Sequence, residues 1–284
     1  MNDTVTKKER APKLHVLLHR RSSFFGAVSN IVRHKNILFQ ACVLDLRTMY
    51  AGTTLGMAWM VLAPLLLLGV YSVVYLFIFR VRPTTITPAE YVLHVAVGLV
   101  AFMNFSTALT ASAASISRHK SVLLNTVFPA ELLPVRAVFV SYAGMVAGLS
   151  IVLVAAICLG KLSPLYLLTP IIFLLQLMLS CALGWVLSLL NIGLRDTQHF
   201  LQFVIVVFMI ASPIGYTPDM VQGKLQLLLY LNPLAYYIQL LQGIIVYNTI
   251  SWGLFAVSVA LAVIPFGAAY WLFQKVKTIF YDYA

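Results

Sequence analysis

The sequence predicts an all-α polytopic membrane protein with six transmembrane helices, an N-terminal amphipathic interfacial helix and a re-entrant outer segment between spans five and six. Of its 284 residues, 61% are hydrophobic and only 10% are charged. Mean hydropathy is +0.94. A soluble domain carries about 25% charged residues and keeps a largely polar surface. This composition therefore excludes a soluble enzyme, a secreted disulfide scaffold and a disordered chain.

Long stretches without Asp, Glu, Lys or Arg define the spans. A helix that crosses a bilayer needs about 20 mostly apolar residues. The charge-free stretches of the sequence have room for six such helices. The predicted spans are 56–79, 91–114, 137–159, 167–190, 198–216 and 253–274.

The longest charge-free stretch, 225–274, contains a break that decides how often it crosses. Asn232-Pro233 interrupts its first half, and the apolar pieces on either side are too short to cross unbroken. Irregular backbone at membrane depth requires cover by protein or a water-filled cavity. We therefore interpret 219–249 as a re-entrant outer segment of two short helices, packed against the other spans.

Lys and Arg positions favour six spans over seven. Six spans put both termini on the cytoplasmic side, with 15 of the 19 Lys and Arg residues. A seventh span would move Lys275 and Lys277 outside, against the positive-inside tendency. The same tendency accounts for the net charge of +11 without invoking nucleic acid.

The N-terminal part is predicted to lie on the membrane rather than in it. Residues 1–29 form a basic cytoplasmic tail, which either touches anionic lipid or stays solvated. Residues 30–50 place apolar side chains at helical spacing, which is typical of an interfacial amphipathic helix. These side chains are Ile31, Leu38, Cys42, Leu46 and Met49. The six-span domain then covers 51–275, and 276–284 forms a cytoplasmic C-terminus.

Chemistry for self-powered transport or catalysis is missing from the sequence. It contains no GxxxxGK[ST] loop to hold ATP phosphates. The predicted spans lack the acidic residues that usually relay protons or sodium. No residue grouping has the spacing of a catalytic or metal site. We therefore predict a translocation subunit that is not an enzyme, has no cofactor or metal of its own, and receives energy from a partner.

Four segments carry a family resemblance. They read RTMYAGTTLGMAWMVLAPLLLLGVYSVVY (47–75), FPAELLPVRAVFVSY (128–142), NIGLRDTQHFLQ (191–202), and SPIGY (212–216) followed by LNPLAYYIQLLQGII (231–245). In this order they resemble the permease subunits of ATP-binding-cassette exporters for O-antigen, capsule or teichoic acid. The resemblance covers roughly residues 30 to 275. One departure is Leu240-Leu241-Gln242-Gly243, where the family often has an Arg.

Physical reasoning and the resemblance together assign candidate roles. Small residues and aromatic anchors between the interfacial helix and span one indicate a cytoplasmic gate or hinge, or anchoring alone. These residues are Tyr50, Gly52, Leu55, Gly56 and Trp59. The resemblance implies that the loops before spans three and five contact the ATPase. The contact residues there are Phe128, Pro129, Glu131, Arg195 and Asp196. Pro129 and Pro134 are expected to bound a short helix along the membrane surface.

Aromatic side chains in the spans suit either packing or a sugar path. Sugar C–H faces stack on aromatic rings, and hydroxyl groups find polar partners beside them. The candidate path residues are Tyr71, Tyr75, Phe102, Phe105, Tyr236 and Tyr237. The outer re-entrant motif consists of Ser212, Pro213, Asn232 and Pro233.

The resemblance implies a permease that exports lipid-linked polysaccharide across the bacterial cytoplasmic membrane. The expected partners are a second copy of the chain, two ATP-binding-cassette ATPase subunits that hold ATP and Mg, and membrane lipids. An exporter of drugs or small lipids shares this architecture and stays open. A polytopic acyl- or glycosyl-transferase and a gradient-driven flippase are further alternatives.

Overall fold

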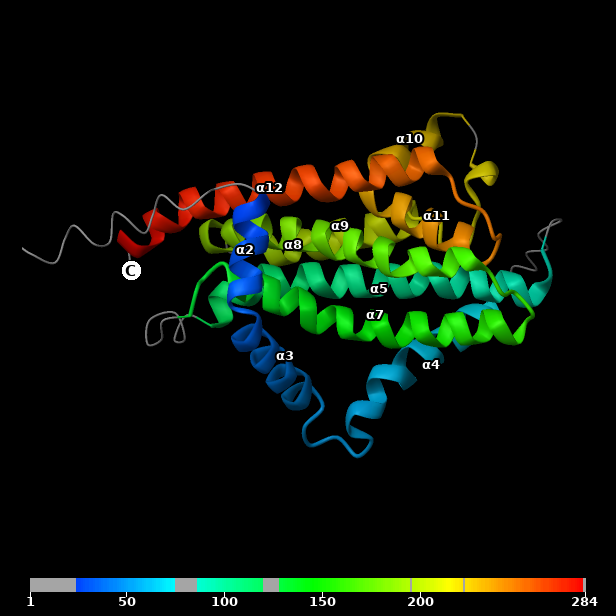
Figure 1. Ribbon diagram of the computed structural model, residues 1–284, viewed down its shortest axis with the longest axis horizontal. Coiled ribbons are helices and arrows are strands. Elements are labelled where there is room, and N and C mark those ends of the chain that lie inside the picture. Colours follow the sequence, from blue (N-terminus) through cyan, green and yellow to red (C-terminus); the bar gives the residue numbers. More distant parts are fainter. Residues whose placement is uncertain (1–23, 75–85, 120–127, 195, 222, 283–284) are drawn as a thin grey trace, which may run out of the picture.

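The computed structural model describes residues 24–74, 86–119, 128–194, 196–221 and 223–282, and these residues form helices and connecting turns without a β-strand (Figure 1). The N-terminal elements are α2 (Phe24–Arg33), α3 (Lys35–Met49), η1 (Gly56–Ala58) and α4 (Trp59–Val73). The central elements are α5 (Pro88–Arg118), α7 (Leu132–Cys158), η3 (Pro164–Leu168) and α8 (Thr169–Gly193). The C-terminal elements are α9 (Thr197–Ala211), η4 (Pro218–Met220), η5 (Gly223–Leu225), α10 (Gln226–Leu231), α11 (Pro233–Ile245) and α12 (Trp252–Asp282).

Helix α5 is the centre of the packing. It contacts α7, α8, α9 and α11, and α12 lies along α8 (Figure 1). Glycines allow the close crossings: a Cβ on Gly148 of α7 would lie 2.8 Å from both Val100 methyl carbons of α5. Small residues at helix contacts are typical of membrane bundles, where van der Waals packing holds the helices together.

Four helices are long and apolar enough to cross a membrane, among the residues that the structure describes. They are Pro88–Arg118, Leu132–Cys158, Pro164–Gly193 and Trp252–Lys277. They coincide with the predicted spans two, three, four and six, except that the helix Leu132–Cys158 ends one residue before the predicted end of span three. The apolar helices Gly56–Tyr71 and Thr197–Ala211 stand where spans one and five were predicted, but both are shorter. Helix α9 ends at Ala211, before Ser212-Pro213 and five residues short of the predicted end of span five.

The predicted single helix over 30–50 is wrong in its extent. The structure has two helices here, α2 and α3, and His34 separates them with φ −103° and ψ 16°. Helix α2 begins six residues earlier than predicted because Phe24 and Ala27 supply an apolar side that packs on α12. On α3, Leu38 is buried and Cys42 is half-buried, while Phe39 and Leu44 are exposed.

The predicted short helix between Pro129 and Pro134 is also not what the described residues form. Helix α7 begins at Leu132, and Pro134 lies in its first turn. Proline is tolerated there because the first backbone N–H groups of a helix have no intrahelical partner. Residues 120–127 of this loop lie outside the described ranges.

The break at Asn232-Pro233 is confirmed. Helix α10 ends at Leu231, and α11 begins at Pro233 with Asn232 as its N-cap, whose side chain accepts a hydrogen bond from the Leu234 N–H at 3.0 Å. The long helices run along the length of the molecule and define its two ends (Figure 1). Helix α2 and the C-terminal part of α12 lie at one end, called here the α2 end. Helices α10 and α11 lie toward the opposite end, called the α11 end.

Candidate functional site

The two halves of the outer re-entrant motif are bonded to each other at the α11 end. The Asn232 amide donates to the Ser212 hydroxyl at 2.9 Å, and that hydroxyl donates to the Phe208 carbonyl at 2.6 Å. Ser212, Pro213 and Asn232 are buried, and Pro233 is half-buried. Twenty residues separate Ser212 from Asn232, so this contact fixes the exit of α9 against the entrance of α11.

Gln242 of α11 extends this junction to α5. Its amide donates to the Pro213 carbonyl at 2.9 Å and to the His94 carbonyl at 3.2 Å. The Tyr91 hydroxyl of α5 donates to the Gly215 carbonyl at 2.7 Å. A buried carbonyl without a donor is costly, so Gln242 stabilises the irregular backbone around Pro213.

An ion pair at the α11 end connects the residues after α7 to the start of α5. Lys161, after α7, lies 2.6 Å from a Glu90 carboxylate oxygen near the start of α5. The same ammonium group donates to the Val246 carbonyl after α11 at 2.6 Å. Glu90 also accepts the Thr87 N–H while Thr87 accepts the Glu90 N–H, which forms a capping box.

At the α2 end, Glu131 is the centre of a second polar cluster. One carboxylate oxygen accepts from Asn30 of α2 at 2.9 Å and from Gln274 of α12 at 3.1 Å, and Lys277 contacts both oxygens. Burial is the largest single effect on the pKa of Glu131, and it raises that pKa because it disfavours the charged form. The positive charge of Lys277 and the hydrogen bonds together lower the pKa by more, so the pKa of Glu131 is lower than usual.

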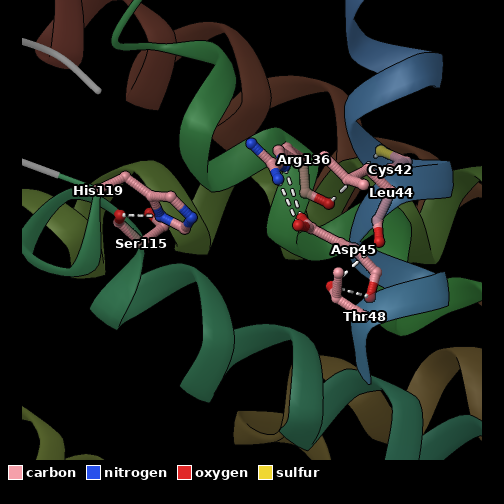
Figure 2. A network of polar contacts seen from close by, with 7 residues as sticks. All are labelled: Cys42, Leu44, Asp45, Thr48, Ser115, His119 and Arg136. Atoms are coloured by element: carbon pink, nitrogen blue, oxygen red, sulfur yellow. Dashed lines mark hydrogen bonds and ion pairs between the residues drawn. The ribbon is translucent and has the colours of Figure 1, made fainter. Parts of the chain in front are cut away.

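A further ion pair joins α3 to α7 (Figure 2). The Arg136 guanidinium binds both oxygens of Asp45, with Nε 2.6 Å from one of them. The Cys42 thiol, one turn earlier on α3, donates to the Arg136 carbonyl at 3.8 Å. Burial raises the pKa of Cys42 to about 11, so the thiol keeps its proton. Helix α3 is therefore attached to the first turns of α7.

The predicted gate residues form a chain of turns between α3 and α4. Tyr50 caps α3, Trp59 starts α4 and Leu55 is exposed between them. Gly52 has φ +80° and Gly56 has φ +52°, and both values lie in the left-handed region that side chains disfavour. In the described part of the chain, no heavy atom other than those of the adjacent residues lies within 4 Å of a Cβ built on either glycine. The linker therefore bends at two glycines and leaves space around them.

The predicted ATPase contacts do not share one environment. Phe128 and Pro129 are half-buried, non-helical residues before α7. Asp196 is exposed before α9, whereas Glu131 is 6% exposed and its carboxylate is occupied. Arg195 lies outside the described residues. Glu131 is therefore buried, whereas Phe128, Pro129 and Asp196 retain exposed surface.

The predicted path residues are also divided. Phe102, Phe105 and Tyr237 are buried in the helix packing, and the Tyr237 hydroxyl donates to the Ser258 carbonyl at 2.9 Å. Tyr71 is half-buried, and Tyr75 lies outside the described residues. Tyr236 lines a hollow of about 240 Å³ at the α11 end. Pro218, Gln226, Leu229, Tyr230, Gln239 and Leu254 line it as well.

Sequence reasoning missed the residues that complete these clusters. Gln242, Trp185, Gln274 and Lys277 received no specific role. Each of these residues has a polar group within or beside an apolar stretch of the sequence. This pattern could have indicated them, since buried polar groups need a hydrogen-bond partner. In the described part of the chain, no three His, Cys, Asp or Glu residues lie close enough to hold a metal ion.

Comparisons with known proteins agree with this architecture. Residues 38–246 match the ABC-2 type transporter family. An O-antigen export system permease protein from Myxococcus xanthus is 28% identical over 211 residues, which cover 73% of this chain and 79% of that protein. Two permease proteins of the same description from Klebsiella pneumoniae are each 26% identical over 193 residues, covering 67% of this chain and 73% of theirs. The chain therefore belongs to the ABC-2 type transporter family.

Proposed function

We propose that this chain is the transmembrane permease subunit of an ATP-driven exporter that moves lipid-linked polysaccharide outward across the cytoplasmic membrane. The observation that carries the proposal is the family match over 38–246, together with the three O-antigen export permeases that resemble most of the chain. A lipid-linked polysaccharide is the proposed substrate because the relatives of this chain are named as permeases of O-antigen export systems. ATP and Mg belong on a separate ATPase subunit.

The proposed topology has six spans and both termini in the cytoplasm. Four helices have spanning length. Helix α9 rises about 22 Å over its 15 residues, against the ~30 Å of a hydrocarbon core. We propose that α9 crosses together with the segment that follows Ser212, and that α4 belongs to span one, whose predicted end lies outside the described residues. The α2 end then faces the cytoplasm, and 219–249 is the re-entrant outer segment.

The proposed assembly is a homodimer with two ATPase copies. One six-span chain is half of the transport unit that the family resemblance implies. Phe128, Pro129 and Asp196 are the described residues that suit contact with the ATPase, because they lie at the ends of helices near the α2 end and retain exposed surface. The turns at Gly52 and Gly56 suit a hinge between α3 and α4 during transport.

Removal of the chain tests the function directly. We expect a deletion strain to lose surface polysaccharide and to accumulate the lipid-linked polymer at its cytoplasmic membrane. Glycan blots of the cell surface and of isolated cytoplasmic membrane measure both quantities, and a plasmid copy should restore the surface polymer. Unchanged surface glycan contradicts polysaccharide export and favours drugs or small lipids. Export that survives ATP depletion but stops with an uncoupler favours a gradient-driven flippase.

Tyr236 is the predicted path residue that we propose to contact sugar. Its hollow combines two tyrosine rings with the amides of Gln226 and Gln239, a combination that suits stacking and hydrogen bonding with a carbohydrate. We expect Tyr236→Ala to slow the appearance of surface polymer about two- to tenfold, the range that corresponds to ~0.5–1.5 kcal/mol for a ring contact. Pulse-labelling of the surface polymer measures the rate.

The matched variant is Tyr236→Phe, which keeps the ring and removes the hydroxyl that donates to the Tyr230 carbonyl at 3.1 Å. It should export at close to the normal rate. Normal export by Tyr236→Ala, at equal protein level in the membrane, argues against a sugar contact here.

A further inference from the structure

Glu131 is enclosed by bonds within the chain. It is 6% exposed, and its carboxylate accepts from Asn30, Gln274 and Lys277 at 2.9 to 3.2 Å. A new partner would have to displace these donors and leave the Lys277 ammonium group without its carboxylate. Removing one member of a buried ion pair is strongly unfavourable. Direct contact between this carboxylate and a docked protein is therefore disfavoured.

The backbone of Glu131 is held as firmly as its side chain. Its carbonyl accepts from the Trp185 indole N–H of α8 at 2.8 Å. The Trp185 ring lies against the rings of Phe266 and Tyr270 of α12, at centroid distances of 5.0 and 5.3 Å. Glu131 immediately precedes α7 and follows Phe128-Pro129 by two residues. A displacement of Phe128-Pro129 therefore reaches this fixed residue directly.

From Glu131 the connections continue to the gate. Asn30 belongs to α2, whose Phe24 packs against Phe266 of α12. Helix α3 follows α2 after one residue and is bound to α7 through Asp45 and Arg136. Two ion pairs thus start from the six residues 131–136, one to α12 and one to α3. Beyond α3 lie the two left-handed glycines and α4.

We propose that Glu131 is a positioning residue that makes α2 and α12 move with the loop that faces the ATPase. It acts through Asn30 and Lys277 and does not touch the ATPase itself. This inference rests on the proposed function, because it assigns a transmission role to the loop of an ATP-driven permease. In the absence of these bonds, the ATPase still docks and hydrolyses ATP, but its movement no longer reaches the gate.

The test uses the complete transporter and measures surface polymer formed per ATP hydrolysed. Glu131→Gln and Lys277→Gln each remove the ion pair, and Asn30→Ala removes the bond to α2 while leaving the ion pair in place. We expect each variant to retain the ATPase subunit and its turnover, and to lose a factor on the order of five or more in polymer per ATP. The exchanged pair Glu131→Lys with Lys277→Glu should recover part of the ratio.

Lys224→Gln is the control, since it removes the charge of an exposed lysine at the α11 end. Its polymer-to-ATP ratio should equal that of the unaltered chain. Loss of ATPase binding in Glu131→Gln, without recovery in the exchanged pair, overturns the inference in favour of direct contact. An unchanged ratio in Asn30→Ala and Lys277→Gln overturns it as well. If the unaltered chain neither retains an ATPase nor exports polymer, the proposed function itself fails, and the inference with it.

Discussion

Replacing Trp185 with alanine lowers the free energy of unfolding by about 3–5 kcal/mol, the cost of deleting a large buried aromatic side chain. Trp185 is 1% exposed, and its ring fills the space between α8 and two aromatic rings of α12. The substitution also leaves the buried Glu131 carbonyl without its indole donor. Thermal unfolding of the detergent-purified protein, followed by the loss of its monodisperse peak, measures the effect.

Trp252→Ala is the matched control for this experiment. Trp252 begins α12, is 66% exposed and has a ring contact with Phe255. Its replacement should change the free energy of unfolding by less than about 1 kcal/mol. Trp185→Phe keeps one aromatic ring but removes the N–H donor and part of the indole volume, so its cost should lie between those of the unaltered chain and Trp185→Ala. Equal midpoints for Trp185→Ala and Trp252→Ala would show that the ring does not join α8 to α12.

Replacing Gly184 with valine forces α5 and α8 apart. Even a Cβ atom on Gly184 would lie 2.9 Å from the Ser112 hydroxyl oxygen and 3.0 Å from the Ser112 Cβ. Ser112 is fully buried, so its side chain has no free space to enter. Overpacking of this kind costs about 1–3 kcal/mol or more, because the helices themselves must move. The thermal midpoint should fall, and less folded protein should accumulate in the membrane.

Gly193→Val provides the comparison on the same helix. Gly193 ends α8, and among the described residues no atom outside its own stretch of helix and its chain neighbours lies within 4 Å of a Cβ at that position. The two variants therefore add the same atoms to α8 in crowded and in open surroundings. The prediction for Gly184 is contradicted if both variants unfold at the same temperature.

The positions of the long helices along the chain could be predicted because they depend on local properties of the sequence. Charge-free stretches correspond to α5, α7, α8 and α12, and an Asn-Pro pair marks the break between α10 and α11. Helix α2 was missed because its apolar side is short and follows a basic region. Its helical state depends on packing against α12, and no local pattern contains that contact.

The contacts between residues of the candidate site could not be predicted from the sequence either, because they join residues that are far apart in the chain. The spacing of Ser212 and Asn232 does not show that their side chains meet. In the sequence, Glu131 is a charged residue in a loop, which is usually accessible to solvent. Its partner Lys277 is 146 residues later in the chain, so the sequence does not show that the two side chains meet. Phe102, Phe105 and Tyr237 matched the composition of a sugar path, yet the helix packing buries them. Burial depends on the relative rotation of neighbouring helices, and the aromatic spacing alone leaves that rotation undetermined.

The bond between Ser212 and Asn232 has an evolutionary consequence. It clamps both ends of the chain that runs through η4 and η5, so the shape of the junction does not depend on the length of the chain between them. Gly223 and Lys224 are exposed within that stretch. Doubling the length of a flexible loop costs only about 0.6 kcal/mol in closure entropy. This stretch is therefore a place where the lineage can gain or lose residues, and where an epitope can be inserted, while the junction beneath it is preserved.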